Sequence, residues 1–128
     1  MNLFNFGNFV LHGGQQSKFK IDCDALTWLD WDTIAQLIVN VLPNPVEIYG
    51  IPTGGERLAK TLKMYAHHDP AGLVWLVDDV LTTGASLMSA AVNIVPARRY
   101  GIVLFARGPI EYIPFPVLTV FTLDKQLY

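Results

Sequence analysis

The sequence has few charged residues, one cysteine and no basic cluster, and each shortage argues against a class of protein. Only 16% of the 128 residues are charged, with nine Lys and Arg, eleven Asp and Glu, and a net charge of −2. The absence of a basic run argues against a nucleic-acid partner. The single cysteine, Cys23, cannot form an intrachain disulfide, so we expect a cytoplasmic protein in a reducing environment.

The chain also lacks an apolar run long enough to span a membrane, although it is hydrophobic overall. Hydrophobic residues make up 52% of the sequence, and the mean hydropathy is +0.34. A chain of this size has little interior in which to bury so much apolar surface. The sequence therefore predicts a single domain over residues 1–128, without membrane contact, that buries part of this surface in a homodimer.

One stretch of the sequence joins an apolar run to a group of polar residues. Residues 73–77 are all apolar, which is typical of a strand buried on both faces. Asp78 and Asp79 follow, then a loop at residues 82–86, and then residues 85–95 with apolar side chains at helical spacing. The pattern predicts a loop between the carboxyl end of a parallel strand and a helix, which is where open α/β sheets bind ligands.

The atoms of this loop suit a phosphate group beside a sugar. The backbone amides of residues 82–86 can point into one concavity, and the first amides of the following helix have no partner within it. The loop also contains three hydroxyl groups and a glycine that permits a tight turn. Asp78 and Asp79 would repel a phosphate, but they can accept hydrogen bonds from sugar hydroxyls or bind a divalent cation. We therefore expect a phosphorylated pentose as the ligand.

A second strand, loop and helix of the same kind lies earlier in the chain. We predict a buried strand at residues 46–51 and a helix at residues 56–67, joined by Pro52-Thr53-Gly54-Gly55. This loop can also present backbone amides to an anion. Alone this loop is a weak signal, because glycines in the left-handed conformation are common at such junctions.

The remaining predicted elements are an irregular aromatic lead into a short strand, a second strand, a helix and two late strands, at residues 4–11, 18–21, 24–42, 101–106 and 117–123. Asp24 or Thr27 can cap the helix, and prolines follow it. Strands that alternate with helices predict an α/β fold, a small three-layer domain with a mainly parallel central sheet.

Residues 77–86, Val77-Asp78-Asp79-Val80-Leu81-Thr82-Thr83-Gly84-Ala85-Ser86, resemble the phosphoribosyl pyrophosphate (PRPP) signature of the type I phosphoribosyltransferases. The alternative is an ordinary strand, turn and helix with a Ser/Thr cap, which explains one hydroxyl but not the adjacent acids. Residues 9–19, Phe9-Val10-Leu11-His12-Gly13-Gly14-Gln15-Gln16-Ser17-Lys18-Phe19, resemble the amino-terminal segment of the orotate phosphoribosyltransferase branch. With the loop at 52–55 and Arg107, the resemblance covers most of the chain.

The resemblance implies transfer of the phosphoribosyl group from PRPP to a nitrogenous base, orotate before others, giving a nucleoside monophosphate and pyrophosphate. Asp78 and Asp79 are then the catalytic residues, which stabilise the ribose. The residues implied for the 5′-phosphate are Val80, Leu81, Thr82, Thr83, Gly84, Ala85 and Ser86. Those implied for pyrophosphate are Pro52, Thr53, Gly54 and Gly55, and those implied for the base are Lys20, Ile21 and Arg107.

For Arg107 a second interpretation stays open, an exposed charge at a strand end. The resemblance also implies Mg²⁺ as cofactor, held mainly through PRPP and without a direct protein ligand, with Asp78 or Asp79 as the alternative. His67 and His68 beside Asp69 are adjacent in sequence, so their side chains do not converge as metal ligands do. We interpret them as part of a solvated loop.

The chain departs from the family at the lid, at two positions that usually hold lysine, and in the amino-terminal hood. The family's long basic lid, between the second helix and the signature strand, is missing, because only residues 67–72 span that gap. Gly54 and His12 stand where the branch usually has lysine, and the amino-terminal hood is reduced. The alternative function is therefore a non-catalytic or weakly catalytic protein that binds PRPP or a nucleotide.

Overall fold

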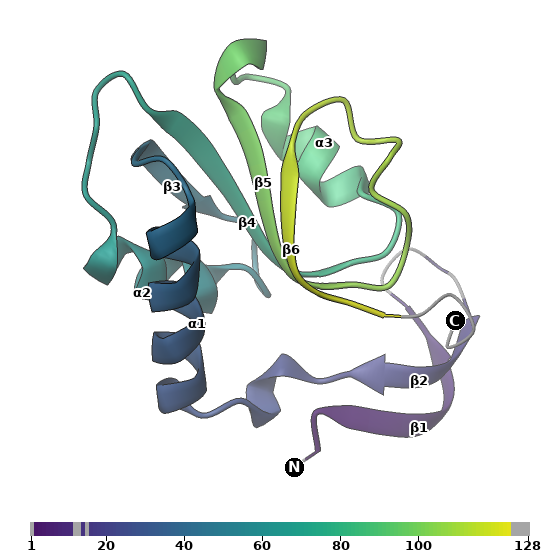
Figure 1. The fold of residues 1–128 in the computed structure, drawn as a ribbon. Coiled ribbons are helices and arrows are strands. Elements are labelled where there is room, and N and C mark those ends of the chain that lie inside the picture. Colours follow the sequence, from purple (N-terminus) through teal and green to yellow (C-terminus); the bar gives the residue numbers. More distant parts are fainter. Residues whose placement is uncertain (1, 12–13, 15, 124–128) are drawn as a thin grey trace.

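The computed structural model of the chain describes residues 2–11, 14 and 16–123 (Figure 1). Its strands and helices, in chain order, are β1 (Phe4–Val10), β2 (Gln16–Ile21), α1 (Trp28–Val41), β3 (Pro45–Gly50), α2 (Glu56–Tyr65), β4 (Leu73–Leu81), α3 (Ala85–Ala91), β5 (Arg99–Ala106) and β6 (Val117–Thr122). Short 3-10 turns lie at Cys23–Ala25 and Pro96–Arg98. No helix in these ranges is both long enough and apolar enough to cross a membrane.

The centre of the fold is a four-stranded parallel sheet in the order β3-β4-β5-β6. Helices α1 and α2 cover one face and α3 covers the other, while the antiparallel hairpin of β1 and β2 lies below the carboxyl ends of the strands (Figure 1). The predicted three-layer α/β fold with a mainly parallel sheet is therefore confirmed. The hairpin is positioned to close over any ligand that binds at the carboxyl edge of the sheet.

Two groups of buried side chains hold these layers together. Trp75 and Val77 of β4 point toward α1, α2 and the hairpin, whereas Val74 and Leu76 point toward α3. This alternation follows from the period of two in a strand. Each group of apolar side chains is covered by helices, which explains why the sequence shows an unbroken apolar run at this point.

The boundaries of α1 differ from the prediction because of a local capping arrangement. The hydroxyl of Thr27 accepts a hydrogen bond from the Asp30 amide at 3.2 Å, and the Asp30 carboxylate accepts one from the Thr27 amide at 2.8 Å. This reciprocal capping box starts the helix at Trp28 rather than at residue 24. Of the two predicted caps, Thr27 is therefore the one used by α1, which ends at Val41.

Other boundaries also depart from the prediction: β2 and β5 each begin two residues early, and β3 lies one residue earlier than expected. The aromatic segment expected to be irregular forms most of β1, with a register shift against β2 between Phe6 and Phe9. Helix α2 ends at Tyr65, two residues early. Helix α3 ends at Ala91 rather than at residue 95, because residues 92–95 are mostly β-branched and precede Pro96, which disfavours helix at that point.

Candidate active site

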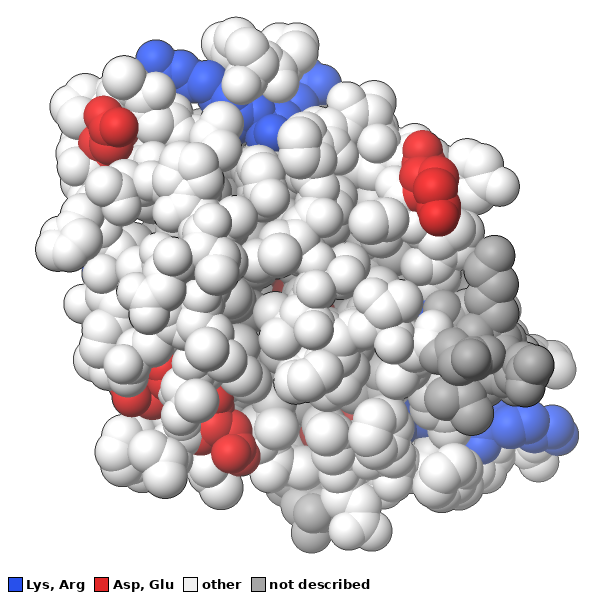
Figure 2. Space-filling model, viewed as in Figure 1, with Lys and Arg blue, Asp and Glu red and all other residues white. Residues whose placement is uncertain are grey.

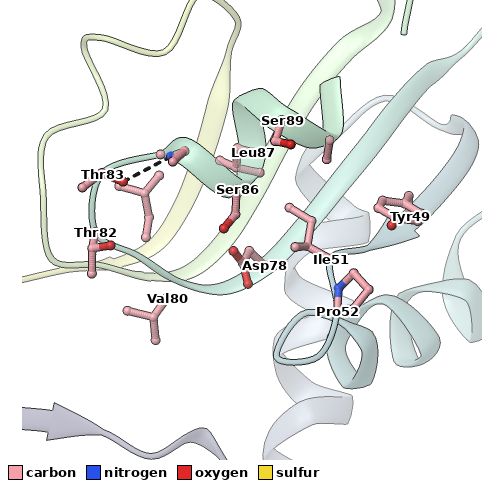
Figure 3. Close-up of a pocket in the computed structure, with 14 residues that line it drawn as sticks. Tyr49, Ile51, Pro52, Asp78, Val80, Thr82, Thr83, Ser86, Leu87 and Ser89 are labelled. Atoms are coloured by element: carbon pink, nitrogen blue, oxygen red, sulfur yellow. Dashed lines mark hydrogen bonds between the residues drawn. The ribbon is translucent and has the colours of Figure 1, made fainter. Parts of the chain in front are cut away.

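Strand β4 carries the paired acids Asp78 and Asp79 within its regular part. The sequence predicted a loop from residue 82 without saying whether the acids belong to the strand, and pairing with β5 continues as far as Leu81. Consecutive strand residues point to opposite faces. Asp78 therefore faces the loop at residues 82–86 (Figure 3), whereas Asp79 faces Gly54.

The loop that follows β4 lines a cavity of about 520 Å³ (Figure 3). Gly84 has a φ of +84°, which favours glycine, and a Cβ there would lie 3.0 Å from Ile113. The Ala85 amide donates to the Thr83 hydroxyl at 3.3 Å. Within the described part of the chain we find no acceptor for the amides of Thr83, Gly84 and Ser86. These amides and the nearby hydroxyls are the donors that the loop offers to an anion.

Helix α3 is short, so it adds little to the binding of an anion. It has only seven residues, and the contribution of its dipole is therefore small. The loop itself, with its glycine turn and its hydroxyl groups, provides the donors. Val80, Leu81 and Ala85 also line this cavity.

A second cavity, of about 550 Å³, connects this loop to the hairpin. It brings together residues that the sequence assigned to the ribose, the 5′-phosphate and the pyrophosphate of PRPP, and to the base. They are Lys20, Ile21, Pro52, Thr53, Gly54, Asp78, Asp79, Val80, Thr82, Ser86 and Arg107. These residues come from segments far apart in the sequence, and they meet because parallel strands end at the same edge of the sheet.

Gly55 lies outside both cavities, in contrast to its predicted neighbours. It is buried, its amide donates to the Ile51 carbonyl at 2.9 Å, and a Cβ there would collide with the Val77 carbonyl. Its amide is therefore already used within the protein. Gly55 packs the loop closely against β4, while Pro52, Thr53 and Gly54 form its exposed surface, with a cis peptide between Pro52 and Thr53.

The two carboxylates of β4 form a linked pair. The Asp78 carboxylate accepts a hydrogen bond from the Asp79 amide at 2.9 Å, and the Asp79 carboxylate accepts one from the Val80 amide at 2.8 Å. Burial, followed by hydrogen bonding and charge repulsion from Asp79, raises the pKa of Asp78 from 3.8 to about 7. The pair therefore favours ligands that stabilise its ionised form, such as hydroxyl donors or a cation.

Arg107 is buried, with only 6% of its surface exposed, so the interpretation as an exposed strand-end charge is wrong. Its Nη2 donates to the Ser17 hydroxyl at 2.5 Å, and its Nη1 donates to the Phe19 carbonyl at 3.3 Å. The guanidinium also lies 4.0 Å from the centroid of the Phe19 ring. The arginine therefore connects the end of β5 to the hairpin while lining the second cavity.

Two observations complete the account of the predicted site. Among the described residues we find no group of three or more His, Cys, Asp and Glu that could hold a metal ion. His12, Gly13 and Gln15, which belong to the segment that resembles the orotate branch, lie outside the described residues.

Solved structures with similar folds include orotate phosphoribosyltransferases. The enzyme from Aeropyrum pernix is 24% identical and has a TM-score of 0.71, and the match covers 94% of this chain and 88% of that one. This chain has the orotate phosphoribosyltransferase fold. The enzyme from Mycobacterium tuberculosis H37Rv in complex with Fe(III) dicitrate has a TM-score of 0.67 at 19% identity, covering 94% of this chain and 89% of that chain.

A longer protein contains the same orotate phosphoribosyltransferase fold. The match to Leishmania donovani UMP synthase covers 98% of this chain and 34% of that one, with 18% identity and a TM-score of 0.67. No family model matches the present sequence, and no curated protein matches it. The likeness is therefore one of fold.

The sequence did not identify two features of the site. Ser17 and Phe19 bind Arg107 across a long separation, and the only signal for this was that both residues belong to the quoted amino-terminal segment. Arg57 and Lys60 line a further cavity beside the loop at 52–55. Their spacing of three residues at the start of a helix was the available signal.

Proposed function

We propose that this protein transfers the phosphoribosyl group of PRPP to a nitrogenous base, with orotate as the favoured acceptor, and releases pyrophosphate. The observation that carries the proposal is the single cavity lined by the glycine loop, the paired acids, the hydroxyl loop and Arg107. The likeness in fold to orotate phosphoribosyltransferases supports it.

In the proposed reaction, the ring nitrogen of the base attacks the anomeric carbon of PRPP. The new C–N bond forms as the C–O bond to pyrophosphate breaks, and positive charge develops on the ribose. The amides and hydroxyls of residues 82–86 hold the 5′-phosphate, so the ribose is fixed relative to the base. Asp78 and Asp79 accept hydrogen bonds from the ribose hydroxyls and place negative charge close to the reacting carbon.

The proposed cofactor is Mg²⁺, bound mainly through PRPP. Oxygen atoms are the ligands that this ion prefers, and it usually uses one or two carboxylates together with substrate phosphates and waters. Asp78 and Asp79 fit this donor set because both line the cavity as carboxylates. When bound, the ion neutralises charge on the pyrophosphate.

Three residues support an acidic, planar base as the acceptor. Arg107 and Lys20 bring positive charge to the cavity, and Ile21 is a buried apolar residue beside them. A carboxylate on the base would pair with a guanidinium, which binds such groups with defined geometry. Orotate is the common nucleobase precursor that carries this carboxylate.

The test is to incubate the protein with PRPP, Mg²⁺ and either orotate or each common nucleobase, and to measure pyrophosphate and nucleotide. We expect both products with orotate, and no products from the Asp79→Asn variant. Tight PRPP binding without turnover for any base would instead favour the non-catalytic alternative. Failure to bind PRPP would refute the proposed transfer, and failure to bind either PRPP or a nucleotide would refute both functions.

We also propose a homodimer. Helix α1 exposes a set of large apolar side chains, Trp28, Leu29, Leu37 and Val41. On the face shown in Figure 2, uncharged side chains predominate and charged ones lie near the margins. Exposed apolar surface of this kind supports association, and light scattering after size-exclusion chromatography tests it.

A further inference from the structure

A third cavity, of about 620 Å³, lies between the hairpin, α1 and α2. It shares Lys20, Thr53, Gly54 and Asp79 with the cavity proposed to bind PRPP. The two spaces therefore meet at the loop of residues 52–55. Residues that line only the third cavity include two cations of α2, Arg57 and Lys60.

Helix α2 directs these two cations to one side. Arg57 and Lys60 are three residues apart, so they lie on the same face of the helix. Leu58, Ala59 and Leu62 are buried on the opposite side, against the sheet. Because α2 begins directly after the loop at 52–55, the exposed cations stand within its first two turns.

Trp31 helps to position Arg57. Trp31 belongs to α1, is buried and lines the same cavity. Its ring centroid lies 5.8 Å from the Arg57 guanidinium. A cation near an aromatic face is attracted to it. Both cations are exposed, and Arg57 is held beside the cavity by its contact with Trp31.

The order of the subsites along the carboxyl edge of the sheet points to the ligand group that belongs here. The hydroxyl loop is followed by Asp78, Asp79 and the loop at 52–55, and then by the cations of α2. A ligand with its phosphate in the hydroxyl loop and its ribose at the acids directs its anomeric substituent toward α2. In PRPP that substituent is pyrophosphate.

We propose that Arg57 and Lys60 bind the departing pyrophosphate in this cavity. This role rests on the proposed function and adds two residues to it. As the C–O bond breaks, its electron pair passes to the pyrophosphate oxygen, and the ring nitrogen that forms the new bond loses its proton to water. The cations of α2 stabilise the charge that pyrophosphate gains in this step.

Carboxylates that line the same cavity limit how tightly pyrophosphate is held, and one of them, Glu56, belongs to α2 itself. Asp22, Asp24 and Glu56 also line it. Burial, and then the charges of carboxylates led by Asp79, raise the pKa of Cys23 to about 12. The third cavity therefore carries negative as well as positive charge, and the repulsion between these carboxylates and pyrophosphate opposes tight retention of the product.

Calorimetry with three ligands tests the role of the α2 cations. PRPP, pyrophosphate and ribose 5-phosphate are titrated at fixed Mg²⁺ into wild type, Arg57→Gln, Lys60→Gln and the control Lys63→Gln. Lys63 is also exposed on α2 but lines neither of the two shared cavities. We expect each of the first two substitutions to weaken binding of PRPP and pyrophosphate about tenfold. Binding of ribose 5-phosphate, and all binding by the control, should stay unchanged.

The outcomes separate this role from the proposed function. If wild type binds PRPP but neither substitution weakens it, or if ribose 5-phosphate is weakened equally, the α2 cations do not bind pyrophosphate and the proposed function survives. If wild type does not bind PRPP at all, both proposals fail. Arg57→Lys should restore part of the lost affinity, and thermal unfolding of each variant separates lost binding from lost folding.

Discussion

The guanidinium of Arg107 binds the hydroxyl of Ser17, 90 residues earlier in the chain, through a hydrogen bond of 2.5 Å from Nη2. The guanidinium also donates to the Phe19 carbonyl and lies over the Phe19 ring. Phe19 belongs to the same strand of the hairpin as Ser17. One side chain at the end of β5 therefore fixes the hairpin over the carboxyl edge of the sheet. The hairpin and the candidate site are coupled through this residue.

We predict that Arg107→Gln lowers the free energy of unfolding by about 2 kcal/mol, because it removes charged hydrogen bonds from a buried position. Orotate binding should be lost as well. Urea unfolding and calorimetry measure the two effects. Arg98→Gln is the control, since Arg98 is exposed and, among the residues that the structure describes, donates a side-chain hydrogen bond only to the Pro70 carbonyl, at 3.4 Å. Equal stability losses in the two variants would show that Arg107 does not anchor the hairpin.

Gly54→Ala should weaken PRPP binding about tenfold while leaving the fold intact. A Cβ at this position would collide with both carboxylate oxygens of Asp79, so the acid must move away from the ribose. Gly54 is itself exposed, which limits the effect on stability. Calorimetry with PRPP measures the loss.

A double-mutant cycle with Asp79→Asn shows whether the glycine acts through the acid. If it does, the double variant binds PRPP no more weakly than Asp79→Asn alone. Additive losses would mean that Gly54 contacts the ligand independently of Asp79.

The sequence predicted those parts of the site that depend on local pattern. The apolar run at residues 73–77 and the two glycine loops were sufficient to predict the parallel sheet and the edge at which its polar residues meet. The continuation of β4 through Asp78 and Asp79 was not predictable in this way, because it depends on pairing with β5. The burial of Arg107 depends on the hairpin in the same manner.

The early end of α3 shows a different limit. Residues 92–95 continue the apolar spacing of the helix, but they are poor helix formers and precede Pro96. Periodicity indicated which side chains face the core, and propensity decided where the helix stops. Gly55 shows the same kind of limit, because its amide is used by Ile51 rather than by a ligand.

Stability should depend on pH through Asp78. Its pKa is raised from 3.8 to about 7 in the folded protein, so between these values the folded state keeps a proton that the unfolded state has lost. The contribution of this group to stability is therefore complete below pH 3.8 and is lost as pH rises through about 7. Asp78→Asn should remove this dependence, so that the variant gains stability relative to wild type as pH rises.

Urea unfolding in EDTA at several pH values between about 4 and about 8 measures the free energy of unfolding of wild type and of Asp78→Asn. Because other groups titrate in both proteins, only the difference reports on Asp78. A difference that stays constant across this range would show that the carboxyl titrates normally.

Thr27→Ala should lower the free energy of unfolding by about 1 kcal/mol, because it removes the hydroxyl that caps α1. The same turn of the helix carries Trp31, whose ring lies beside Arg57, so a frayed start would also loosen the third cavity. Thr33→Ala is the matched control on the same helix. The hydroxyl of Thr33 only donates back to the Leu29 carbonyl at 2.9 Å, and its loss should change stability by less than about 0.5 kcal/mol. Chemical unfolding followed by circular dichroism compares the two, and a Thr27 variant as stable as the control would show that the capping box does not determine where α1 begins.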